Sequence, residues 1–117
     1  MADRLDEITE RLRAFVTERD WAQFHDPKNL AMAVASESGE LLAEYRWIAN
    51  AEADAWSQDL MNKKRVSMEA ADVAIALLLL CDRVGINLVQ AIGEKIGLNG
   101  LNYPVESSRG RHSRPES

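Results

Sequence analysis

The chain has 117 residues and a formal net charge of −5, with 46% hydrophobic and 28% charged residues. This composition is typical of a soluble globular protein of one domain, and it excludes a largely disordered chain. The acidic balance argues against a nucleic-acid-binding domain, because phosphate backbones require a basic face. The longest apolar run, Val73 to Cys81, is too short to span a membrane, and the charged N-terminus predicts no signal peptide. We therefore expect a cytoplasmic protein without a membrane partner.

Two helices are predicted in the first half of the chain. From Asp3 to Arg19, apolar residues recur at steps of three and four, which indicates an amphipathic helix. A second helix is expected to begin after Asp26, which suits an N-cap because Pro27 follows it in the first helical turn. It extends to Ile48 and carries several glutamates on one face.

The second half predicts two more helices after a break. Residues 50–64 lack periodicity and are read as a mobile connector with room for one short helix. A third helix, Val66 to Arg83, is apolar almost all round, as buried central helices are, and Gly85 ends it. A fourth begins after Asn87 and runs through Leu98.

The predicted fold class is therefore all-α, a four-helix, bundle-like arrangement. We expect one domain at residues 1–104 and a disordered tail at residues 105–117, where Ser, Arg, Gly and Pro replace the apolar pattern. A helix that is apolar on most sides is difficult to bury in so short a chain. Packing the central helices of two copies together would cover it, which predicts a homo-oligomer, either a dimer or a tetramer.

The second and third predicted helices each contain an acidic motif of the form acid-x-x-acid. Each places two carboxylates three residues apart, Glu37 with Glu40 and Glu69 with Asp72. Residues three apart lie about 60° from each other on a helix, so each pair points one way. Four converging carboxylates repel one another unless a cation joins them, and all-oxygen ligands favour Mg²⁺, Mn²⁺ or Ca²⁺. The pattern therefore predicts a site for a hard divalent cation.

Two other interpretations of the acidic motifs fit the sequence less well. A single acidic pair on a helix is most often a solvated face, but the third helix is too apolar to offer one. Di-iron bundle proteins pair glutamates with Glu-x-x-His motifs. The histidines of this chain are His25 and His112, and neither follows a glutamate by three residues.

Further stretches match a known family, in order along most of the chain. They are Glu18-Arg19-Asp20-Trp21-Ala22-Gln23-Phe24-His25, Pro27, Asn29-Leu30, Gly39-Glu40-Leu41, Trp47, Glu69-Ala70-Ala71-Asp72-Val73, Lys95, Asn99 and Tyr103-Pro104. Together with the two acidic motifs, these stretches resemble the MazG-like, all-α nucleoside triphosphate pyrophosphohydrolases. Within that family the chain looks most like the dCTP pyrophosphatase branch.

The resemblance implies hydrolysis between the α- and β-phosphates of a nucleoside triphosphate, to the monophosphate and pyrophosphate. It makes dCTP or a related or modified deoxynucleotide the expected substrate, and pool house-cleaning the expected role. The implied Mg²⁺ ligands are Glu37, Glu40, Glu69 and Asp72, with Mn²⁺ as a possible substitute. Either Glu37 or Glu40 would also take the proton of the attacking water.

The resemblance also implies a substrate pocket. Its residues would be Trp21, Ala22, Gln23, Phe24, His25 and Trp47 around the base, and Lys95, Asn99 and Tyr103 toward the phosphates. The chain departs from the family at Gly97, Gly100, Leu101 and Asn102, and Ala76 replaces a pocket tyrosine. Two alternatives stay open: a related pyrophosphohydrolase acting on, for example, phosphoribosyl-ATP, and a non-catalytic helical module that binds nucleotide or metal.

Overall fold

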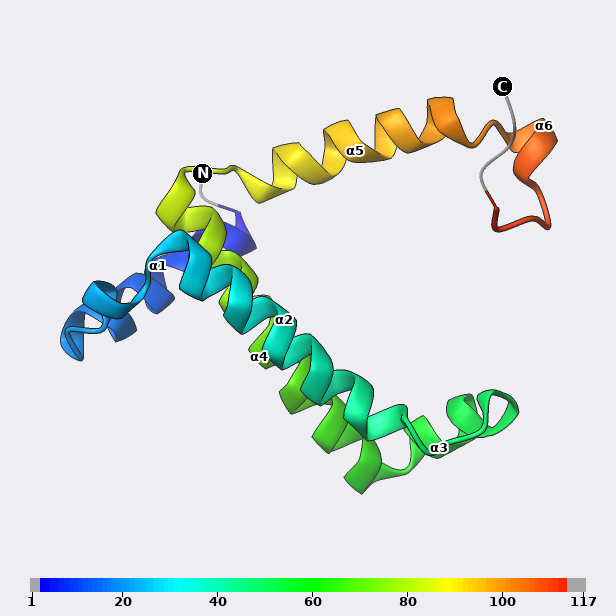
Figure 1. Ribbon diagram of the computed structural model, residues 1–117, viewed down its shortest axis with the longest axis horizontal. Helices are drawn as coiled ribbons and strands as arrows, with labels where there is room; N and C mark the ends of the chain where they lie inside the picture. The colour runs from blue at the N-terminus through cyan, green and yellow to red at the C-terminus, as the bar shows by residue number, and fades with distance from the viewer. Residues whose placement is uncertain (1–2, 114–117) are drawn as a thin grey trace. The chain divides into compact units, whose positions relative to one another are not determined.

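The computed structural model describes residues 3–113, and every regular element within them is helical (Figure 1). The elements are α1 (Arg4–Glu18), η1 (Ala22–Phe24), α2 (Pro27–Tyr45), η2 (Asn50–Glu52), α3 (Ala53–Gln58), α4 (Leu60–Val84), α5 (Leu88–Asn102) and α6 (Val105–Ser108). The all-α prediction is confirmed. Among the described residues no single helix is both long and apolar enough to cross a membrane, although α4 and α5 taken together pass that test by length and composition alone.

The chain divides into two compact units, one ending at Gly85 and one beginning at Ile86. The first contains α1 to α4, and the second contains α5 and α6. The predicted domain of residues 1–104 includes all of the first unit and part of the second, and its boundary remains a prediction.

The first two helices begin where the sequence predicts. The Asp3 carboxylate accepts a hydrogen bond from the backbone N–H of Asp6 at 2.8 Å, and α1 follows. Asp26 accepts from the backbone N–H of Asn29 at 2.9 Å, with Pro27 in the first turn of α2. These carboxylates satisfy backbone donors that the helix itself leaves unpaired.

The third predicted helix is longer than expected. α4 begins at Leu60 and not at Val66, because the Asp59 side chain caps it by accepting from the backbone N–H of Asn62 at 3.1 Å. Leu60 is exposed, so the first turn of α4 carries no buried stripe that periodicity would detect. The lysines and arginine of residues 63–65 therefore belong to a helix, and the predicted connector shrinks to η2, α3 and their flanking turns.

Helices α2 and α4 form the main packing contact of the first unit. They run antiparallel and side by side over most of their length (Figure 1). Leu30 on α2 is only 3% exposed, and Ala76, Leu78 and Cys81 on α4 are also buried. α1 packs against α4, where the Arg13 guanidinium Nε donates to Asp82 at 3.0 Å.

The second unit is built on α5. Asn87 caps the helix as predicted, since its side chain accepts from the backbone N–H of Gln90 at 3.1 Å. The predicted end at Leu98 is wrong, because Gly100 lies within a helix that continues to Asn102, just before Pro104. Within the predicted tail the structure has the four-residue helix α6, and residues 114–117 lie outside the described residues.

Candidate functional site

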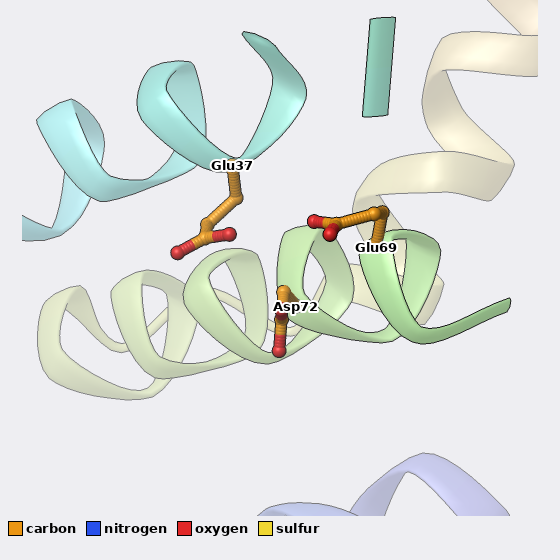
Figure 2. A group of neighbouring side chains, drawn as sticks. All are labelled: Glu37, Glu69 and Asp72. Atoms are coloured by element: carbon orange, nitrogen blue, oxygen red, sulfur yellow. The ribbon is translucent and has the colours of Figure 1, made fainter. Parts of the chain in front are cut away.

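Three carboxylates meet between α2 and α4. Glu37 from α2, and Glu69 and Asp72 from α4, each place an oxygen within 4.8 Å of the others. Figure 2 shows the Glu37 side chain extending toward α4 and the Glu69 carboxylate directed toward Glu37. Glu37 and Glu69 are half-buried, whereas Asp72 is exposed. A group of this kind is open to solvent on one side and enclosed by helices on the other.

The arrangement follows from helix geometry. Glu69 and Asp72 are three residues apart, so both project from the same face of α4. Because α2 packs antiparallel along that face, Glu37 is presented to both of them. The convergence therefore needs no loop, and all three positions are fixed by regular backbone.

Glu40 is the fourth predicted ligand, and it lies outside this three-carboxylate group. It is exposed on α2, one turn beyond Glu37. Its charge nevertheless reaches the group. Partial burial raises the pKa of the Glu69 carboxyl above its ordinary value, and four nearby carboxylates raise it further. In decreasing order of effect these are Asp72, Glu40, Glu37 and Glu44.

The raised pKa of Glu69 reflects the loss of hydration around its carboxylate and repulsion from the neighbouring carboxylates. Like charges held close together disfavour ionisation, as does the loss of hydration. A cation that bound there would relieve both effects. The group offers only carboxylate oxygens, the donors preferred by Mg²⁺, Mn²⁺ and Ca²⁺, and neither a thiolate nor an imidazole belongs to it.

Sequence reasoning missed an ion pair at the edge of the acidic group. Arg65 Nε lies 3.3 Å from Glu44 Oε2, joining α4 to α2. A signal for it existed. Arg65 lies seven residues before Asp72 and Glu44 lies seven after Glu37, which are matching positions when two helices run antiparallel along their acidic faces.

A groove adjoins the acidic group along α4. It is open, mostly apolar and about 550 Å³ in volume, and it lies between α1, the segment of residues 21–25 and α4. Its α4 wall includes Ala71, Ile75 and Leu78. Ile75 follows Asp72 by three residues, so the groove and the acidic group occupy neighbouring faces of one helix.

Two of the predicted base-binding residues line this groove, Trp21 and His25. Trp21 is 43% exposed, and its ring meets the Phe15 ring edge to face at a centroid distance of 5.6 Å. Aromatic side chains placed in this way offer a partly open face to a planar ligand.

The other residues of that segment lie differently. Ala22 lines a smaller hollow of about 250 Å³ that also touches His25 and the Arg13–Asp82 contact. The Gln23 amide donates to the backbone carbonyl of Asp20 at 3.0 Å, and Phe24 is largely exposed. Roles for Ala22, Gln23 and Phe24 in binding a base remain predictions.

Trp47 lies beyond the end of α2 and is 84% exposed. The Arg46 guanidinium lies 5.3 Å from the centre of its ring. A role for Trp47 in a pocket is a prediction that these contacts do not test. Lys95 and Asn99 lie on α5, and Tyr103 follows that helix, so all three belong to the second unit. Their predicted contact with substrate is likewise untested.

Fold and site together define an all-α protein with three carboxylates gathered between two antiparallel helices. The crystal structure of a pyrophosphatase from Archaeoglobus fulgidus is similar to it, with a TM-score of 0.82 and 35% sequence identity, over 89% of this chain and 95% of that chain. No family model matches the chain.

Curated proteins give the same direction. The chain is 36% identical over 106 residues to dCTP pyrophosphatase 1 of Rattus norvegicus, and 37% identical over 108 residues to dCTP pyrophosphatase 1 of Bos taurus. Each match covers 91% of this chain, which spans 62% of the rat protein and 63% of the bovine one. The chain belongs to the all-α, MazG-like pyrophosphatase family.

Proposed function

We propose that this protein hydrolyses deoxynucleoside triphosphates, dCTP or a related or modified deoxynucleotide, to the monophosphate and pyrophosphate. The observation that carries the proposal is the three-carboxylate group formed by Glu37, Glu69 and Asp72 beside an apolar groove lined by Trp21 and His25. The names of the rat and bovine relatives and of the archaeal structure support the reaction class. A role in cleansing the cytoplasmic nucleotide pool fits that reaction.

The residues of the acidic group fit a divalent cation, with Mg²⁺ as the physiological choice and Mn²⁺ as a substitute. Glu37, Glu69 and Asp72 would hold it, while Glu40 lies outside this group. When bound, the ion supplies charge neutralisation for the phosphates and a lowered pKa for a water ligand. Hydrolysis at a triphosphate depends mainly on such positioning and charge stabilisation.

Glu40 is the better candidate for general base. Glu37 already belongs to the three-carboxylate group, whereas Glu40 lies one turn away, outside it and exposed. A carboxylate that is not committed to a cation keeps its lone pairs available for a proton. We therefore assign the proton of the attacking water to Glu40, and the holding role to Glu37.

The base is proposed to enter the groove, with its plane against Trp21. Base–aromatic stacking is worth about 1–3 kcal/mol in nucleic-acid binders. Lys95, Asn99 and Tyr103 are proposed to contact the phosphates, with Trp47 as a further aromatic neighbour of the base. Ala76, which is buried on α4, leaves more space than a tyrosine would, which favours loose base selection.

A homo-oligomer is proposed as the working form. Apolar side chains along α5 stay exposed in the single chain, including Ile92, Ile96 and Leu101. On α1, Phe15 is exposed as well. Burying such surface in a second copy is the ordinary remedy, and light scattering coupled to gel filtration would measure the resulting mass.

The proposal is tested by incubating the protein with each deoxynucleoside triphosphate, and with phosphoribosyl-ATP, in Mg²⁺. Products are separated so that monophosphate with pyrophosphate is distinguished from diphosphate with phosphate. We expect pyrophosphate from at least one deoxynucleotide and none after Glu37→Gln. Turnover of phosphoribosyl-ATP alone would contradict the substrate class. Tight deoxynucleotide binding without turnover would instead identify a non-catalytic module, an alternative that the departures from the family pattern at Gly100, Leu101 and Asn102 favour.

A further inference from the structure

The acidic face of α2 continues past the three-carboxylate group to a further carboxylate. Glu44 follows Glu37 by seven residues, which returns it to within about 20° of the same direction on the helix. Its side chain is 21% exposed, so it is directed toward the α4 side rather than into open solvent. Its charge contributes to the raised pKa of Glu69. Glu44 is thus placed like a ligand, yet it stands outside the group of Glu37, Glu69 and Asp72.

What holds Glu44 is Arg65. The Arg65 Nε donates to Glu44 Oε2 at 3.3 Å, and its Nη2 donates to Asn62 Oδ1 at 3.3 Å. Asn62 is itself anchored, since its Nδ2 donates to the backbone carbonyl of Trp56 at 3.0 Å. The guanidinium is therefore oriented from two sides, and through it Glu44 is tied to the first turns of α4.

Position on α4 separates Arg65 from its cationic neighbours. Arg65 precedes Glu69 by four residues, so it shares the acidic face of the helix. Lys64 is displaced from Arg65 by about 100° around the helix axis and is exposed. Lys63 bonds the Gln58 side chain at 2.9 Å. Of this basic run, Arg65 is the member that pairs with the α2 carboxylates.

We propose that Arg65 is a positioning residue that holds Glu44 away from a cation bound by Glu37, Glu69 and Asp72, so that Glu44 takes no part in its coordination. This inference rests on the proposed metal site. The physical reason is that Glu44 can neutralise one positive charge, either that of Arg65 or part of that of the ion. While the guanidinium satisfies it, Glu44 adds neither a ligand nor a net charge to the site.

The test measures Mn²⁺ binding to the 117-residue chain, without any substrate, by electron paramagnetic resonance of free Mn²⁺ and by calorimetry. Arg65→Gln should tighten Mn²⁺ binding by about 2- to 10-fold, because it removes a nearby positive charge and releases Glu44. Lys64→Gln is the matched control, with the same change in net charge at a position off the acidic face. Arg65→Lys should stay close to wild type.

A double-mutant cycle isolates the pairing. Glu44→Gln should weaken Mn²⁺ binding by a few-fold, because Arg65 is then unpaired beside the ion. Adding Arg65→Gln to Glu44→Gln should change the affinity less than it does in the wild type, since no carboxylate is left to release. Far-UV circular dichroism checks that each variant folds, and Arg65→Lys provides the test if Arg65→Gln does not.

The outcomes separate this inference from the metal site itself. Wild-type protein that binds no Mn²⁺ would overturn the proposed metal site and this inference together. Wild-type binding with an unchanged or weaker affinity in Arg65→Gln would overturn the inference alone. The inference would also be overturned if Lys64→Gln had the same effect on Mn²⁺ affinity as Arg65→Gln. It would be overturned as well if Arg65→Gln changed the affinity equally in the presence and absence of Glu44. If Arg65→Lys is the only Arg65 variant that folds, a change in its affinity of the kind that a charge loss would cause overturns the inference.

Discussion

Glu37 on α2 and Glu69 on α4 face each other across two packed helices, with an oxygen of each within 4.8 Å of the other. Asp72 also places a carboxylate oxygen within 4.8 Å of both. Without a cation, the folded chain holds like charges together, which costs stability. The carboxylates that destabilise the metal-free fold are also the proposed metal ligands. Changes in the stability of the protein therefore test their role in metal binding.

Replacing Glu69 with Gln should therefore have opposite effects on the two forms of the protein. The neutral amide removes repulsion, so the metal-free Tm should rise. It also removes a ligand, so the increase in Tm produced by Mg²⁺ or Mn²⁺ should be largely lost. Thermal unfolding followed by circular dichroism, with and without metal, measures both. Glu52→Gln, an exposed position on η2, is the control and should change neither.

The metal-free protein should also show a characteristic pH dependence. The pKa of Glu69 is raised above the ordinary value of 4.5, so the folded chain binds this proton more tightly than the unfolded chain. The free energy of unfolding contributed by Glu69 is then greatest below the unfolded pKa and declines as pH rises through the folded pKa. Urea unfolding at a series of pH values gives this contribution as wild type minus Glu69→Gln. A difference that grows with rising pH would contradict it.

Much of this fold was predictable because its signals are local. Asp26 and Asn87 cap helices within three residues of themselves, and Gly85 ends α4 with a φ of +85°. The start of α4 at Leu60 was missed because its first turn is exposed and carries no apolar stripe. Asp59, with Asn62 three residues later, was the overlooked signal.

The site was predictable only in part, for a similar reason. Spacing alone places Glu69 and Asp72 on one face of a helix, and pairing them with Glu37 needs only that α2 and α4 pack. Whether Glu40 or Glu44 completes the group depends on the rotation and offset of one helix against the other. Those are set by the packing of buried residues such as Leu30 and Leu78, which spacing does not encode.

Gly39 offers a stability prediction within α2. A Cβ added at this glycine would meet no atom within 4 Å, and the residue lies inside α2. Gly39→Ala should raise the free energy of unfolding by about 0.5–1 kcal/mol, since glycine is the poorer helix former. Chemical denaturation measures it. If activity falls while Mn²⁺ binding is kept, then Gly39 serves close approach of substrate to α2.

Trp21 and Trp47 can be compared as matched aromatic truncations. Trp21 lines the groove, whereas Trp47 is 84% exposed beyond the end of α2. Trp21→Ala should raise the KM for the preferred deoxynucleotide by about 5- to 100-fold, the range expected for losing a stacked base. Trp47→Ala should have the smaller effect. Steady-state kinetics on both variants measures KM, with Mn²⁺ affinity as a check on the acidic group. A larger increase in KM for Trp47→Ala than for Trp21→Ala would contradict the prediction.

The acidic group between α2 and α4 is proposed to catalyse pyrophosphohydrolysis. The most direct measurement is pyrophosphate release from dCTP in Mg²⁺ by wild type, Asp72→Asn and Glu52→Gln. We expect release by wild type and Glu52→Gln, and a loss of at least about 100-fold in Asp72→Asn, because the removed carboxylate supports charge stabilisation worth several kcal/mol. Full activity in Asp72→Asn would contradict the claim.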